Sequence, residues 1–142
     1  MATPAPIPRG DKTYLDEQYA SVRWISDGPW VLLEWKAWAN SSEYRSVYEL
    51  VLLALRENRA SRNLIDAKRR RVVSEDDQRW LAEDWIPRAG AAGRRFTAIV
   101  IPDSPLGKTI AENVQKRQAP NSTKVEYFLT AEEAAAWLSM VN

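Results

Sequence analysis

The 142-residue sequence contains no cysteine and no histidine. Without cysteine there are no disulfides, thiolate nucleophiles or thiolate metal ligands, and without histidine there are no imidazole ligands, imidazole general bases or histidine pH switches. Most familiar active-site designs are excluded, which leaves carboxylate, lysine, tyrosine or serine chemistry, or no chemistry at all. We therefore expect a protein that is not an enzyme and that uses no metal and no cofactor.

The sequence also lacks an excess of charge and any long apolar run. Its 20 basic and 19 acidic side chains leave a formal charge of +1, too small for a general attraction to nucleic acid or to an acidic membrane. No window approaches the ~18 apolar residues of a membrane-spanning helix, and the first ten residues lack the apolar stretch of a signal peptide. We expect a cytoplasmic protein without a nucleic-acid partner or a transmembrane segment.

Proline is concentrated at the N-terminus, where Pro4, Pro6 and Pro8 precede Gly10. This composition disfavours both helix and strand and predicts a flexible N-terminal arm over residues 1–12. The remaining residues, 13–142, have the length of a single domain with one substantial core.

Hydrophobic periodicity predicts five strands. Two alternating runs flank a turn of Ser, Asp, Gly and Pro, which is typical of an antiparallel hairpin. A later, nearly continuous apolar run is typical of a central strand covered on both faces. The predicted strands are residues 19–25, 30–38, 63–66, 96–101 and 125–129.

Four helices are predicted from capping residues that precede apolar stripes at helical spacing. The first follows Asn40-Ser41-Ser42, any of which can cap it, and the second follows Ser74. The third runs from Asp103 to about Gln118, and the fourth follows Thr130. The order β-β-α-β-α-β-α-β-α predicts an α/β domain, with a five-stranded, mostly parallel sheet and flanking helices.

Several short segments carry a family resemblance along residues 14–140. They are Leu33-Glu34-Trp35-Lys36, Ser42-Glu43-Tyr44, Leu64-Ile65-Asp66, the run from Ser74 to Leu81, Ala98-Ile99-Val100-Ile101-Pro102, Tyr127-Phe128-Leu129, Ala134 and Trp137-Leu138. With the order of elements, they resemble the STAS-like (SpoIIAA-like) domains of bacterial proteins, most of unknown function. These domains share the fold of anti-sigma-factor antagonists and a topology theme with lipid-transfer proteins of the CRAL-TRIO type.

One departure from that family concerns its phosphoserine switch. In the regulatory STAS proteins the third strand ends in aspartate, followed at once by a phosphorylatable serine or threonine and a glycine. Here Asp66 is followed by Ala67 and Lys68, and the next hydroxyl is Ser74. The resemblance therefore implies neither the switch nor an anti-sigma partner for this chain.

A basic run precedes the second helix, at the predicted carboxyl edge of the sheet, where open α/β folds bind ligands. One interpretation is a site for a phosphate or carboxylate, aided by the helix start. The other is a solvated loop that pairs with the acids at 75–77. The candidate residues are Asp66, Lys68, Arg69, Arg70, Arg71 and Ser74.

Seven tryptophans are many for a chain of this length. Aromatic residues at strand or helix spacing usually pack in a core. The alternation in the second strand nevertheless puts Trp30 and Trp38 on the face opposite Trp35, so that one side of the strand cannot bury all three. The alternative interpretation is an aromatic-lined pocket or a protein-contact patch, with Trp35 and Trp38 as candidates.

Adjacent carboxylates at 76–77, 83–84 and 132–133 are the remaining catalytic candidates. Neighbouring residues on a helix point about 100° apart and cannot converge on one cleft as a general acid and base must. Two of the pairs lie in first helical turns, where acidic side chains stabilise the helix dipole. These pairs are therefore interpreted as structural.

We arrive at two hypotheses of function. The first is a non-enzymatic STAS-like interaction module that associates with itself as a homodimer, or with another protein. Leu50 and Leu53 motivate it, because they widen the apolar stripe of the first helix beyond one core contact. The alternative is a carrier or sensor of a small lipophilic or anionic ligand, bound at the carboxyl edge of the sheet.

Overall fold

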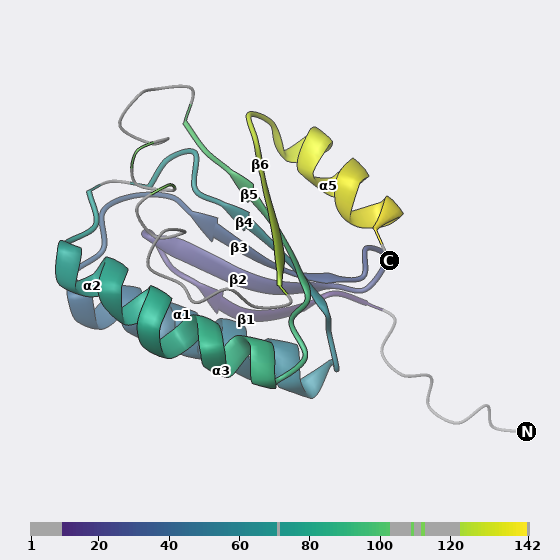
Figure 1. The fold of residues 1–142 in the computed structure, drawn as a ribbon, viewed down its shortest axis with the longest axis horizontal. Helices are drawn as coiled ribbons and strands as arrows, with labels where there is room; N and C mark the ends of the chain where they lie inside the picture. The colour runs from purple at the N-terminus through teal and green to yellow at the C-terminus, as the bar shows by residue number, and fades with distance from the viewer. Residues whose placement is uncertain (1–9, 71, 103–108, 110–111, 113–122, 142) are drawn as a thin grey trace, which may run out of the picture.

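The computed structural model describes residues 10–70, 72–102, 109, 112 and 123–141. Within this part of the chain, six strands form one sheet in the order β1-β2-β3-β4-β5-β6, so each strand lies beside its predecessor in sequence (Figure 1). Neighbouring strands are antiparallel from β1 to β3 and parallel from β3 to β6. The predicted α/β class is confirmed. The sheet is mixed and has six strands where five, mostly parallel, were predicted.

The additional strand is β1, at the edge of the sheet. Its register with β2 shifts between Thr13 and Leu15, and such a bulge removes the strict alternation by which a strand is detected in sequence. Tyr14 Oη donates to Glu57 Oε1 at 2.6 Å, and Lys12 Nζ lies 3.2 Å from the same oxygen. The strands are β1 (Lys12–Asp16), β2 (Ala20–Ile25), β3 (Trp30–Trp35), β4 (Arg62–Asp66), β5 (Phe96–Val100) and β6 (Lys124–Phe128).

The predicted capping positions are confirmed, and of the three candidates at 40–42 it is Asn40 that caps the first helix. Asn40, Ser74 and Thr130 each accept a hydrogen bond from the backbone N–H three residues later. The helical segments are α1 (Ser41–Glu57), α2 (Glu75–Trp80), the π-helical η1 (Leu81–Trp85), α3 (Ile86–Ala91) and α5 (Ala131–Met140). The helix predicted from Asp103 to Gln118 lies, apart from residues 109 and 112, outside the described residues.

The second predicted helix is one helical run with a wide turn inside it. α2, η1 and α3 follow one another without a break, and the N–H of Ile86 bonds to the carbonyl of Leu81, five residues earlier. Pro87 lies just after this turn and has no N–H to give to Glu83. Because a proline ring clashes with the carbonyl four residues before it, a wider turn lets the helix continue past Pro87.

The second predicted strand is shorter in the structure. β3 ends at Trp35, not at Trp38, and the N–H groups of Lys36 and Ala37 both bond to the carbonyl of Tyr19. The chain must turn here to reach the cap of α1 at Asn40. Trp38 therefore lies in a loop instead of on a strand face.

The sheet separates two apolar layers. Val31, Leu33 and Trp35 face α1 and the α2–α3 run, whereas the alternate residues Trp30 and Leu32 pack with the cluster under α5. Figure 1 shows α1 beside the continuous α2–α3 run along the sheet, with α5 apart from them near β5 and β6.

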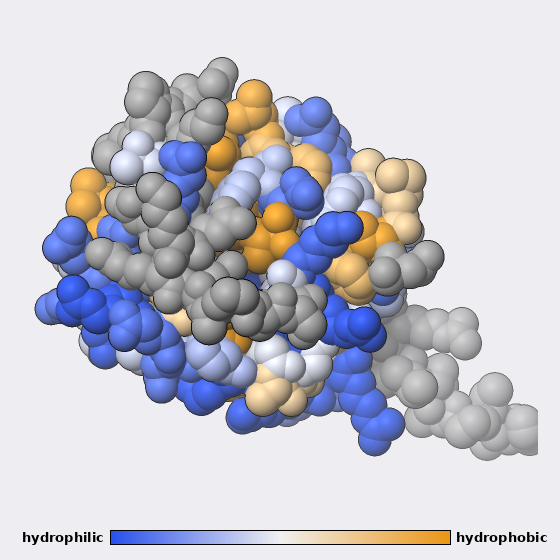
Figure 2. All heavy atoms as spheres, viewed as in Figure 1, coloured by the Kyte–Doolittle hydropathy of each residue, from blue (hydrophilic) through white to orange (hydrophobic). Residues whose placement is uncertain are grey.

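The outer surface over α2 and its neighbouring turns is mostly hydrophilic in Figure 2. This distribution is the one expected of amphipathic helices that bury one stripe against a sheet. Among the residues that the structure describes, no helix is long and apolar enough to cross a membrane.

Candidate functional site

The starts of α1 and α2 meet beyond the carboxyl end of β3 and enclose a pocket of about 160 Å³. The parallel connections β3–α1–β4 and β4–α2–β5 place both helix starts at the same edge of the sheet. This edge is where open α/β sheets bind ligands.

Three segments line the pocket: the end of β3 with its following loop, the first turn of α1, and the β4–α2 loop with the start of α2. The lining residues are Trp35, Ala37, Trp38 and Ala39, then Asn40, Ser41 and Tyr44, then Arg70, Val72, Val73, Ser74 and Asp77.

Two residues of this wall each have a buried polar atom without a hydrogen-bond partner in the described part of the chain. Trp35 and Tyr44 are 1% and 3% exposed, their rings stack at 5.3 Å, and both Trp35 Nε1 and Tyr44 Oη are unpartnered among the described residues. A buried indole N–H or phenol O–H usually finds a partner, and leaving one unpaired costs about 1–3 kcal/mol. Both residues line the pocket, and both atoms are buried from water within its wall.

The other fully buried tryptophan provides an internal comparison. Trp85 is as buried as Trp35, but its Nε1 donates to the carbonyl of Tyr48 at 2.7 Å. Tyr48 also contacts Tyr44, at 5.1 Å between ring centroids, so that both tryptophans belong to one aromatic cluster. Within that cluster the indole N–H of Trp85, on the core side, has an acceptor. The indole N–H of Trp35, on the pocket side, has none among the described residues.

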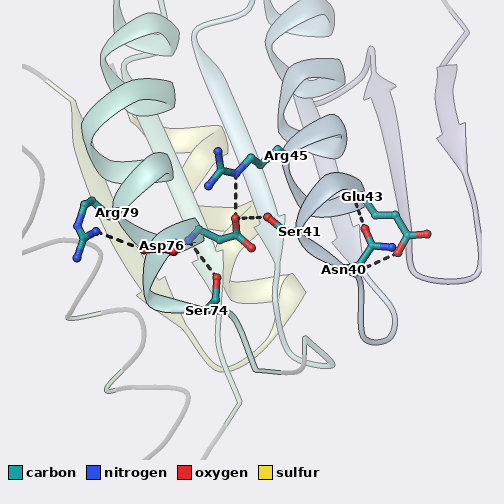
Figure 3. Close-up of polar contacts among 8 residues, drawn as sticks. Asn40, Ser41, Glu43, Arg45, Ser74, Asp76 and Arg79 are labelled. Atoms are coloured by element: carbon teal, nitrogen blue, oxygen red, sulfur yellow. Dashed lines mark hydrogen bonds and ion pairs between the residues drawn. The ribbon is translucent and has the colours of Figure 1, made fainter.

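The acid of the pocket, Asp77, is already neutralised by the protein. Its Oδ1 accepts from Ser41 Oγ at 2.7 Å and from Arg45 Nε at 2.9 Å, and its own N–H donates to Ser74 Oγ (Figure 3). Burial acts to raise the pKa of Asp77, but the hydrogen bonds from Ser41, Arg45 and Ser74 outweigh it and lower the pKa. Asp77 is therefore an ionised bridge between α1 and α2.

Arg70 is the pocket cation whose side chain has no partner among the residues that the structure describes. Its half-buried side chain makes no ion pair or hydrogen bond with any residue in the described part of the chain. By contrast, Arg69 points to Glu34 at 3.5 Å and is exposed, and Lys68 is exposed. The residues of the predicted basic run therefore do not act together. Among its described residues, Arg70 alone lines the pocket.

The expected pairing of this run with the acids at 75–77 is not seen among the described residues. Asp77 pairs with Arg45 and Asp76 with Arg79, on the side of α2 away from α1 (Figure 3). Asp66 is half-buried at the end of β4, where it accepts from the Lys68 N–H. Arg71 lies outside the described residues.

The pocket rim carries two large apolar side chains that face water. Trp38 is 61% exposed and Val72 is 70% exposed, and they come from the two loops that flank the pocket. Single exposed apolar residues are ordinary on a protein surface. Two at one pocket give its lining apolar surface that faces water.

The residues proposed for self-association lie elsewhere, on α1. Leu50 is half-buried and packs against the core, and Leu53 is exposed. The apolar surface that motivated the homodimer is therefore narrower than the sequence pattern indicates. Self-association itself stays a prediction.

Each of the three carboxylate pairs contributes at least one side chain to an ion pair or a helix cap. Asp84 and Glu49 both bond to Arg88, which ties α3 to α1, and Glu133 belongs to the cap of α5. The described residues hold no group of three or more acids that could form a metal site.

Sequence reasoning identified part of the pocket. It named Trp35, Trp38, Arg70 and Ser74, and the structure brings all four to one pocket. It assigned Tyr44 to the core stripe of the first helix, and it did not name Val72. Tyr44 was detectable in principle, because a phenol in the first turn of a buried stripe raises the question of its hydrogen-bond partner.

Comparison with known proteins adds no further constraint. The chain matches no family model, no curated protein and no solved structure.

Proposed function

We propose that this chain is a non-enzymatic, STAS-like module that binds a small molecule in the pocket at the starts of α1 and α2. The observation that carries this proposal is the pair of buried, unpartnered groups, Trp35 Nε1 and Tyr44 Oη, in the pocket wall. The position of the pocket at the carboxyl edge of a parallel sheet supports it. Of the two sequence hypotheses, this is the carrier or sensor.

The chemistry of the pocket supports binding over catalysis. A general acid or base must be able to change protonation near neutral pH. Asp77 is held ionised by Arg45 and Ser41, and burial, followed by the neighbouring Tyr48, raises the pKa of Tyr44 well above its ordinary value. Neither group is poised to transfer a proton near pH 7.

The STAS-like part of the proposal rests on element order and topology. Strands β2 to β6 keep the predicted succession of a hairpin followed by parallel strands, with β1 added at the edge of the sheet. Fold alone does not specify a ligand. The pocket therefore carries the functional part of the proposal.

Native mass spectrometry of the freshly purified protein, paired with denatured spectra, tests the proposal. We expect additional mass that disappears on denaturation and that is lost in Ala39→Phe, which fills the pocket. Ala136→Phe, on the exposed side of α5, is the matched control and should retain that mass. A wild-type protein with no retained mass, and with no compound in a small-molecule library that raises its Tm, would overturn the proposal. The same spectra report whether the chain is a monomer or a dimer.

A further inference from the structure

The size of the pocket limits its ligand to roughly one ring. A buried apolar cavity of about 150 Å³ is known to hold benzene, and the pocket described here measures about 160 Å³. Its lining includes Trp38 and Val72, whose exposed apolar surfaces suit the nonpolar part of such a molecule. A long acyl chain would have to lie mostly outside it.

The hydrogen-bonding groups inside require a ligand that accepts. An indole Nε1–H is a donor only, so Trp35 can be satisfied only by an acceptor. Tyr44 can donate as well, and its raised pKa, caused first by burial, keeps the phenol protonated. Trp35 Nε1 and Tyr44 Oη, on two stacked rings, have no acceptor among the described residues, and two such donors suit an oxygen with more than one lone pair.

The charges of the pocket favour an anion. Arg45 neutralises the carboxylate of Asp77, so Arg70 supplies the uncompensated charge among the described lining residues. The start of the 17-residue helix α1 adds the positive end of a helix dipole on the same wall. A cationic ligand would meet both positive groups, and the carboxylate among the described lining residues, Asp77, is already paired with Arg45.

Resting on the proposed function, we infer that the ligand is a small organic acid with one ring-sized apolar group. Its oxyanion binds the Arg70 guanidinium and accepts hydrogen bonds from Trp35 Nε1 and Tyr44 Oη. Its apolar part lies against Trp38 and Val72.

Three molecules of nearly equal shape separate charge from size: benzoate, benzamide and benzamidine, which are anionic, neutral and cationic. Each is titrated into the ¹⁵N-labelled protein while the seven tryptophan indole N–H signals are followed, with Trp35 assigned by its loss in Trp35→Phe. We expect benzoate to shift the Trp35 signal and to bind about tenfold or more tightly than benzamide, as hydrogen bonds to a charged group imply. Benzamidine should not bind.

Arg70→Gln should remove the preference for benzoate over benzamide. Arg69→Gln, next to it but outside the pocket, should retain the preference, and equal Tm values would show that both variants are folded. Trp35→Phe and Tyr44→Phe should each weaken benzoate binding several-fold, because each removes one donor.

The outcomes distinguish this inference from the function on which it rests. If benzamide or benzamidine binds as tightly as benzoate, the pocket binds ligands but the anion assignment is wrong. If none of the three binds while native mass spectrometry shows a retained molecule, the ligand class is again wrong and the proposed function stands. If none binds, no mass is retained and no library compound raises the Tm, the proposed function fails as well.

Discussion

Removing the carboxylate of Asp77 tests the bridge that joins the two helix starts. Asp77→Ala leaves Ser41 Oγ and Arg45 Nε without the oxygen that they contact at 2.7 and 2.9 Å. A hydrogen bond to a charged group contributes about 1.5–3 kcal/mol. Because the half-exposed Arg45 can turn to water in the variant, the loss of its contact lowers the free energy of unfolding by less than the loss of a buried contact would. We therefore expect the free energy of unfolding to fall by about 2–4 kcal/mol.

Asp76→Ala is the matched control, because it removes the neighbouring carboxylate from the same helical turn. The side chain of Asp76 is 82% exposed, against 6% for Asp77, and its partner Arg79 lies 3.3 Å away on the outer side of α2 (Figure 3). Both acids interact with the positive end of the helix, so this contribution is common to the two variants. We expect Asp76→Ala to cost less than about 1 kcal/mol.

Urea denaturation followed by tryptophan fluorescence measures both losses, and equal m-values would validate the comparison. The reasoning is refuted if the two variants lose the same free energy. It is also refuted if Asp77→Ala stabilises the chain, since the carboxylate would then be a strained group and not a bridge.

Three further predictions concern pH, buried aromatics and glycine. Burial acts to raise the pKa of Asp77, but hydrogen bonds lower it. The contribution of the ionised carboxylate to the free energy of unfolding is therefore complete above the ordinary pKa of 3.8, and it is lost as the pH falls through the lower folded-state pKa. The stability difference between the wild type and Asp77→Asn, measured by urea titration, should shrink below that pH. Trp85→Phe should cost about 2–3 kcal/mol, because it opens a cavity and loses a 2.7 Å hydrogen bond, whereas Trp38→Phe should change the free energy of unfolding by less than about 0.5 kcal/mol. Gly93 has a φ of +111°, so Gly93→Ala should lower stability by about 1–2 kcal/mol, while Gly90→Ala, inside α3, should raise it by about 0.5–1 kcal/mol in the same assay.

The parts of the fold that sequence predicts best are those in which one physical signal acts alone. The stripe of α1 and the caps at Ser74 and Thr130 appear in the structure where the pattern places them, and the cap of α1, Asn40, is one of the three residues that the pattern offered. Each cap depends on one side chain and one backbone N–H three residues away, so nothing distant in the chain can move it. Such local rules remain valid in any tertiary context.

Predictions failed where a second, distant requirement competed with the local pattern. β1 is held by Glu57, 43 residues beyond Tyr14, and its bulge hides its alternation. β3 stops at Trp35 although the apolar alternation continues to Trp38, because the carbonyl of Tyr19 takes the next two N–H groups. The π-helical turn before Pro87 has no signal in hydrophobic periodicity at all.

The candidate site shows the same division between local and distant information. Sequence reasoning located the basic loop and two of the tryptophans, because charge runs and aromatic counts are visible without a fold. It could not choose among neighbouring cations. Arg69 pairs with Glu34 of β3, and only the sheet register, which sets Glu34 beside Asp66, brings that carboxylate within reach. Arg70 is left for the pocket as a consequence of strand pairing.

Tyr44 shows why an apolar stripe alone conceals a binding group. Its position at the start of the α1 stripe buries the ring against Trp35, as a core residue requires. Burial of the ring also removes water from its hydroxyl, and no described residue replaces that water. A core selected only for stability would have phenylalanine here, because an unpaired buried hydroxyl costs free energy that a phenyl ring does not. Positions at which a sequence departs from the rule that favours its own fold are those where function is expected. By this argument Tyr44→Phe should leave the free energy of unfolding unchanged or raise it while it weakens ligand binding, and a variant that loses stability without losing affinity would place Tyr44 in the core alone.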